Sequence, residues 1–244
     1  AAPKKKKPKE WWKQGQPRFA KSDLGRVFSG TIDLQNSRRP ATLKALAIRV
    51  GEPLEAGTSA TVLFDTELLR ASGAVPDHFV AFNTYRDGLG GSGHRLGPPY
   101  VFTTRREPGW AKDGKFDDPR SKPNGPLPRD WAKYRGLYRH GPRTVLSYTV
   151  GKTSVLESPW IEAAGDVRAV SRTLEIGAAK VPLLLKVCDV DGLKGEVQTA
   201  DGRSWLLLEK DEQLTAVGIV SDRGGDKIKL ATADKGRVVV EVSP

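Results

Sequence analysis

Apolar residues recur at every second position in short runs along most of the chain after residue 27. Each run is bounded by Gly, Pro, Ser or Asp, a pattern typical of half-buried β-strands. The runs are VFSGTIDL, ALAIRV, ATVLFD, RTVLSYTV, TSVLESPWI, VRAVSRTLEIG, VPLLLKV, GEVQTA, SWLLLEK, LTAVGIV, DKIKLATA and RVVVEVS. Turn signals between strands so closely spaced indicate antiparallel meanders. We therefore expect an all-β protein, an antiparallel β-sandwich of jelly-roll-like form.

Three stretches refine this expectation. Residues 143–161 join two alternating runs through Gly151-Lys152 and predict a β-hairpin. Residues 65–72, DTELLRAS, fit either a helical turn or an edge strand, and residues 78–85, HFVAFNTY, are a further strand candidate. No repeat of about 40 residues is visible, which argues against a complete propeller.

A long irregular region at 86–135 interrupts the strand pattern. Connections longer than about 15 residues without regular structure usually bind or cover something. Aromatic residues spread along the region and just past its end could fasten it to the core. They are Tyr100, Phe102, Trp110, Phe116, Trp131, Tyr134 and Tyr138. We expect a loop insert that is both anchored and functional.

The domain organisation follows from these patterns. Residues 1–20 form a basic arm with six lysines between Lys4 and Lys13, and its two adjacent tryptophans are expected to dock on this chain or a partner. Residues 21–187 form the main sandwich with its insert at 86–135. Residues 188–244 form a C-terminal meander, packed on the main domain or continuous with it.

The net charge of +11, from 40 Lys and Arg against 29 Asp and Glu, could attract nucleic acid, anionic lipid or acidic polysaccharide. Because much of the excess lies in the arm, a solvated arm is the simpler interpretation, and nucleic acid is not an expected partner. No apolar run approaches the roughly 20 residues of a membrane helix, so no transmembrane segment is expected.

Cysteine usage and the first residues bear on location. The single cysteine cannot form an internal disulfide, and without a CxxCH motif the chain cannot attach haem covalently. The chain has no methionine and begins Ala-Ala-Pro, which suits the end left by signal-peptide cleavage. We expect an extracytoplasmic protein, periplasmic or secreted.

Residues 109–162, GWAKDGKFDDPRSKPNGPLPRDWAKYRGLYRHGPRTVLSYTVGKTSVLESPWIE, carry a family resemblance, supported by LAIRV, VLFDTELLRASG, NTYRDGLGGSGHR and SRTLEIG. The chain resembles a domain of unknown function found near the N-terminus of large exported planctomycete-type proteins. In that family the domain often precedes a propeller similar to sorbosone or glucose dehydrogenases, with a c-type cytochrome module. The resemblance implies that any haem c would lie on a partner or another domain, and it assigns no catalytic residue.

Aromatic side chains beside Arg and Asp in the insert suggest sugar recognition, because pyranose C–H faces stack on aromatic rings while hydroxyls take charge-assisted hydrogen bonds. The candidate ligand-binding residues are Arg86, Asp87, His94, Arg95, Trp110, Arg129, Asp130, Trp131 and Tyr134. The same residue types can instead fasten a long loop to a sheet.

Clustered carboxylates in DGKFDDP could hold calcium, the one cofactor considered for this chain. Asp113, Asp117 and Asp118 offer hard oxygen ligands, although aspartates beside Gly and Pro also form ordinary turns. A similar, weaker case is DVDGLKGE, residues 189–196. Ser92 in GLGGSGHR lacks the strand-turn-helix context of a nucleophile elbow, so a serine hydrolase is rejected.

Two functions fit these observations. The first is a non-catalytic module of an exported multidomain protein or complex, which assembles with other domains or subunits and could bind carbohydrate through the insert. The alternative is the leading domain of a haem- or quinone-linked sugar dehydrogenase that contributes substrate contacts. No catalytic motif decides whether the protein is part of an enzyme.

Overall fold

The computed structural model describes residues 24–34, 42–81, 94–121, 124–190, 195–201, 203–210, 213–221, 228–233 and 236–244. Within these ranges the strands are β1 Val27–Asp33, β2 Thr42–Val50, β3 Ala60–Asp65, β4 Arg70–Pro76, β5 His94–Arg95, β6 Phe102–Thr103, β7 Ala132–His140, β8 Arg143–Val150, β9 Thr153–Ala164, β10 Val167–Ile176, β11 Leu183–Asp189, β12 Val197–Ala200, β13 Arg203–Lys210, β14 Gln213–Ile219, β15 Ile228–Ala233 and β16 Arg237–Val242. The described ranges hold no α-helix, and none that could cross a membrane. The all-β prediction is confirmed.

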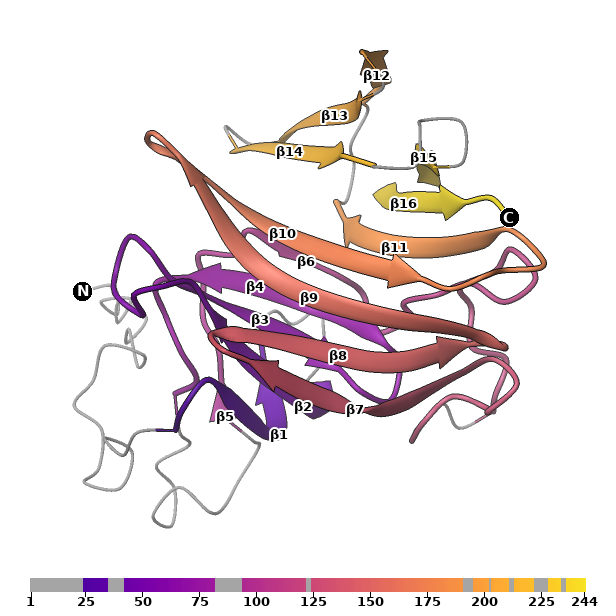
Figure 1. Cartoon of the computed structure of the whole chain (residues 1–244), viewed down its shortest axis with the longest axis horizontal. Helices are drawn as coiled ribbons and strands as arrows, with labels where there is room; N and C mark the ends of the chain where they lie inside the picture. Colours follow the sequence, from indigo (N-terminus) through magenta and orange to yellow (C-terminus); the bar gives the residue numbers. More distant parts are fainter. Residues whose placement is uncertain are drawn as a thin grey trace, which may run out of the picture.

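Two sheets form the main sandwich (Figure 1). The first has the order β5-β1-β2-β3-β4-β6 and the second the order β10-β9-β8-β7. Consecutive strands pair antiparallel, whereas β5 pairs parallel to β1. The antiparallel sandwich is therefore confirmed, and its larger strands are joined as meanders.

The core between the two sheets follows from alternation along the strands. Ile48 and Phe64 point inward from the first sheet, and Leu146 and Tyr148 from the second. The rings of Phe64 and Tyr148 stack with their centroids 5.9 Å apart. Burying each large apolar side chain of this kind contributes about 1.5–3 kcal/mol. The predicted hairpin is present as β8 and β9, paired from Val150 and Thr153.

The opposite face of the first sheet is also buried. Ile32, Leu63 and Val75 pack there against Val80 and Leu96 of the connection that follows β4. Residues 66–69 form a tight turn, because the Asp65 carboxylate accepts the backbone N–H groups of residues 67 and 68. β4 pairs with β3 and β6 on its two sides, so residues 65–72 form neither a helical turn nor an edge strand.

The C-terminal strands form two small sheets, ordered β11-β16-β15 and β12-β13-β14. They share a core of Cys188, Leu206, Leu208, Leu230 and Val238. The strand β11 serves both parts of the molecule, because Leu183 and Leu185 belong to the main core while Cys188 belongs to the C-terminal one.

Candidate binding face

The two tryptophans of the insert lie in the sandwich core. Trp110 is 0% exposed and Trp131 is 5% exposed. The indole nitrogen of Trp131 donates a hydrogen bond to the backbone carbonyl of Trp110 at 2.9 Å. Trp110 also forms a bridge to Leu185 of β11. Neither ring can stack on a ligand in this arrangement, and both fasten the insert to the body.

The other candidate residues lie on two different sheets. His94 and Arg95 form β5, where the His94 ring meets Phe28 edge-on at 5.1 Å and burial lowers the pKa of His94. Arg129 and Asp130 are exposed just before β7. Tyr134 is half-buried within β7, and burial raises its pKa. Arg86 and Asp87, like residues 1–20, lie outside the described residues.

The three carboxylates proposed for calcium do not converge. Asp118 is bound by Arg120, whose Nη2 lies 2.7 Å from Oδ2, and this hydrogen bond holds the pKa of Asp118 below its usual range. Asp113 occupies a tight turn with a φ of 51°. Among the residues that the structure describes, no group of three or more His, Cys, Asp or Glu could hold a metal ion. Asp113 therefore lies in a turn, and Asp118 lies in an ion pair with Arg120.

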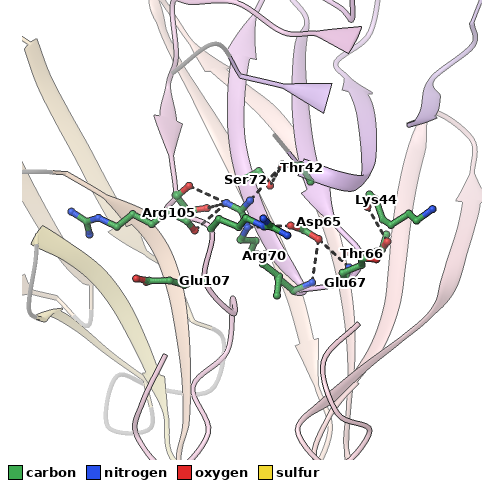
Figure 2. A network of polar contacts seen from close by, with 12 residues as sticks. Thr42, Lys44, Asp65, Thr66, Glu67, Arg70, Ser72, Arg105 and Glu107 are labelled. Carbon is green, nitrogen blue, oxygen red and sulfur yellow. Dashed lines mark hydrogen bonds and ion pairs between the residues drawn. The ribbon is translucent and has the colours of Figure 1, made fainter. Parts of the chain in front are cut away.

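A buried network of charges joins the insert to the first sheet (Figure 2). Arg70 donates to Asp65 at 3.3 Å and to the carbonyls of Thr104 and Arg105 at 2.9 and 3.0 Å. Burial lowers the pKa of Arg70, although Asp65 opposes this shift. Because Arg70 is buried among these partners, we assign the network a structural role rather than a binding role.

A second cluster links the insert to the C-terminal sheets. The Glu107 carboxylate accepts from Lys186 at 2.9 Å and from Arg237 at 2.8 Å. Burial lowers the pKa of Lys186 to about 8. Burial alone would raise the pKa of Glu107, but the two cations outweigh it and lower that pKa. Asp189 of β11 accepts from Arg105, so this one carboxylate of the DVDGLKGE segment is also structural.

Within the described ranges, no strand covers the outer face of the β10-β9-β8-β7 sheet. Figure 1 shows this sheet as the front layer, with no labelled element before it. Strand register assigns its outward residues, which we call the open face. They are Lys133, Tyr138, His140, Arg143, Val145, Ser147, Thr149, Ser154, Leu156, Ser158, Trp160, Glu162, Ser171, Thr173 and Glu175. The face combines aromatic, hydroxyl and charged side chains.

Two aromatic positions stand out on the open face. Tyr138 is 63% exposed. The Arg143 guanidinium lies 3.9 Å from the centroid of the Trp160 ring, a cation–π contact. His140 pairs with Arg143 across the β7–β8 turn. From strand spacing and rise per residue, Tyr138 and Trp160 lie roughly 12 Å apart.

Reasoning from the sequence alone missed this face because it looked for function in the loops. A usable signal was present in the predicted hairpin. Continuing the register from Val150 and Thr153 places Arg143 opposite Trp160 on the outward side. His140 lies at the end of β7 beside Gly141, whose φ is 54°.

The fold and the open face define a β-sandwich domain with one sheet whose outer face no other described strand covers. Residues 62–157 match the model of a family described as a domain of unknown function (DUF6797). The match runs from β3 into β9, and it includes the insert, Tyr138 and Arg143. No curated protein and no solved structure matches the chain.

Proposed function

We propose that this chain is a non-catalytic β-sandwich module of a larger exported protein or complex, and that it binds carbohydrate on the open face. The observation that carries the proposal is the exposed Tyr138 beside the Arg143–Trp160 pair on an uncovered sheet. The multidomain setting rests on the sequence resemblance to domains of large exported proteins.

The chemistry of the open face suits a sugar chain. Pyranose rings present C–H faces that stack on aromatic rings, and their hydroxyls take hydrogen bonds from charged and hydroxyl groups. Tyr138 offers the exposed ring, and stacking on Trp160 orients the Arg143 guanidinium. Ser147 and Thr149, further along β8 from Arg143, are half-exposed and offer hydroxyl groups. Small molecules prefer concave pockets, whereas a broad sheet face suits an extended polymer.

Binding to a panel of soluble and insoluble polysaccharides, followed by calorimetry, tests the proposal. We expect Tyr138→Ala to weaken binding about five- to tenfold, the equivalent of roughly 1 kcal/mol for one stacking contact. Trp160→Ala should weaken binding by a similar factor, because it removes the ring that orients the Arg143 guanidinium. Trp205→Ala, on β13 of another sheet, is the matched control and should change affinity less than about twofold. Absence of binding to every polysaccharide, or equal losses in all three variants, would overturn the proposal.

A further inference from the structure

Strand β7 and its flanks concentrate positive charge on one edge of the open face. Between residues 129 and 143 the basic side chains are Arg129, Lys133, Arg135, Arg139, His140 and Arg143. Asp130 is the single acidic residue in this stretch, and its carboxylate is bound by Lys112. Register turns Arg139, which pairs with the buried Thr144, away from the open face. The remaining cations of β7 and β8 form a cationic strip, which we define as Lys133, Arg135, His140 and Arg143.

Most other arginines that the structure describes form an ion pair with a carboxylate, and the cations of the strip do not. Arginine–carboxylate pairs elsewhere in the described chain are Arg26–Glu52, Arg70–Asp65, Arg105–Asp189, Arg120–Asp118, Arg168–Asp77, Arg172–Glu157 and Arg237–Glu107. Within the ranges that the structure describes, Lys133, Arg135 and Arg143 form no ion pair. Like charges placed together without counter-charges repel one another, so the strip does not stabilise the fold. The same positive potential attracts an anionic ligand.

The position of the strip makes it accessible. β7 is the edge strand of its sheet, and Arg135 and His140 are exposed. The ladder shifts register between Tyr134 and Gly136, so Arg135 lies at a β-bulge. From Lys133 to His140 the strip extends roughly 24 Å along the strand. Tyr138 lies within this length and is the exposed ring of the strip.

The strip is narrow because the far side of the open face is acidic. Glu175 on β10 and Glu162 on β9 are exposed, whereas the cations lie on β7 and β8. Neighbouring strands are about 5 Å apart, so the cationic part of the sheet is only about two strands wide. A single extended chain fits this width, and a broad polyanion such as a nucleic-acid duplex would also meet the glutamates.

We infer that the ligand of the open face is an acidic polysaccharide, a single chain bearing carboxylate or sulfate groups that lies along β7. The inference rests on the proposed carbohydrate binding and specifies its class. Guanidinium groups bind carboxylate and sulfate oxygens in bidentate fashion, and Tyr138 stacks on one sugar ring between them. Single-stranded nucleic acid is the weaker fit, because it needs successive aromatic platforms and the strip offers one largely exposed ring.

Matched pairs of polymers test the inference with the full chain. Polygalacturonate is compared with its methyl ester, and dextran sulfate with dextran, so that each pair differs in charge on a common backbone. We expect at least tenfold tighter binding to one charged member than to its neutral partner. We also expect that affinity to fall steeply as salt rises from about 50 to 500 mM, because salt screens exposed charges. The two pairs distinguish carboxylate from sulfate.

Charge-matched variants separate the strip from general basicity. Lys133→Gln/Arg135→Gln should weaken binding to the preferred acidic polymer at least tenfold. Arg203→Gln/Lys229→Gln removes the same charge from exposed positions on β13 and β15 and should weaken it less than about threefold. Circular dichroism checks that both variants fold.

The failures are distinguishable. Equal affinity for the charged and neutral members overturns the acidic class and leaves carbohydrate binding in place. Equal losses in the two double variants overturn the role of the strip. Tighter binding to single-stranded DNA than to either acidic polymer assigns the strip to nucleic acid. Binding to none of the polysaccharides overturns both the inference and the proposed function.

Discussion

Trp131 donates its indole N–H to the carbonyl oxygen of Trp110 across 2.9 Å of the sandwich core. The two residues lie 21 positions apart, at the start and end of the proline-rich part of the insert. Their contact joins the two ends of that part of the insert, and Leu127 packs in the same core. This arrangement separates the residues that hold the insert from those that face solvent on the open face.

We predict that Trp131→Phe lowers the free energy of unfolding by about 3 kcal/mol, because it leaves a buried carbonyl unpaired and a small cavity behind. Urea unfolding measures the loss. Trp205→Phe, which alters a half-buried ring on β13, should cost less than about 1 kcal/mol. Loss of polysaccharide binding in Trp131→Phe with unchanged stability would place the ligand on the insert instead of the open face.

A buried ion pair inside the main core gives a second prediction. Glu157 accepts from Arg172 at 2.6 Å and from the Tyr148 hydroxyl at 2.7 Å. Burial alone would lower the pKa of Arg172, but Glu157 outweighs it and raises that pKa. We expect Glu157→Gln to lower the free energy of unfolding by about 3–5 kcal/mol, because it leaves the buried Arg172 guanidinium without a carboxylate partner.

The double variant Glu157→Leu/Arg172→Met is the control for this pair. It removes both charges and fills the space with apolar groups, so it should recover most of the loss seen in Glu157→Gln. The comparison uses chemical denaturation at neutral pH. A double variant no more stable than Glu157→Gln would mean that altered packing, rather than the unpaired guanidinium, causes the loss of stability.

The sequence predicts strands well where one face is buried and the other is open. β8 alternates half-buried and buried residues along its whole length, so the pattern RTVLSYTV matches Arg143–Val150. β4 was missed because residues 70–75 are all buried, which removes the alternation. β7 was read as loop at its start, because an edge strand tolerates polar residues and its bulge shifts the alternation by one position.

The candidate site was harder to predict than the fold. Aromatic residues near Arg and Asp can anchor a loop or bind a sugar, and composition does not separate the two roles. The structure separates them through burial, since Trp110 is enclosed and Tyr138 is exposed. The open face also depends on pairing between distant strands, as in Arg143 and Trp160, which are 17 positions apart and meet only through sheet register.

Gly109 provides a third prediction, based on close approach of two backbone segments. A Cβ added there would lie 2.0 Å from the carbonyl oxygen of Leu69 and 2.7 Å from the Cα of Arg70. Neither backbone atom can move without displacing the start of β4. We expect Gly109→Ala to cost about 3 kcal/mol of unfolding free energy, whereas Gly114→Ala, in open space at a turn, should act only through its positive φ and cost about 1 kcal/mol. Similar losses in both would contradict the packing argument.

The titration of Lys186 is expected to raise the free energy of unfolding as pH increases above 8. Its ammonium is buried, and its pKa of about 8 lies below the ordinary value of 10.5. Below pH 8 the folded protein bears the full penalty of burying this charge. Between pH 8 and 10.5 the unfolded chain holds the proton that the folded protein has lost, so the lysine contributes increasing stability as pH rises.

We therefore predict that the unfolding free energy of the wild type rises by about 2 kcal/mol relative to Lys186→Met between pH 8 and pH 10. Subtracting the variant removes the titration of tyrosines and exposed lysines, which both proteins share. Glu107 keeps Arg237 at 2.8 Å in the variant, so its carboxylate is not left unpaired. Denaturant unfolding at several pH values measures the difference. A difference that stays constant, or falls, across this range would show that Lys186 remains protonated in the folded state and that Glu107 and Asp189 together offset its burial.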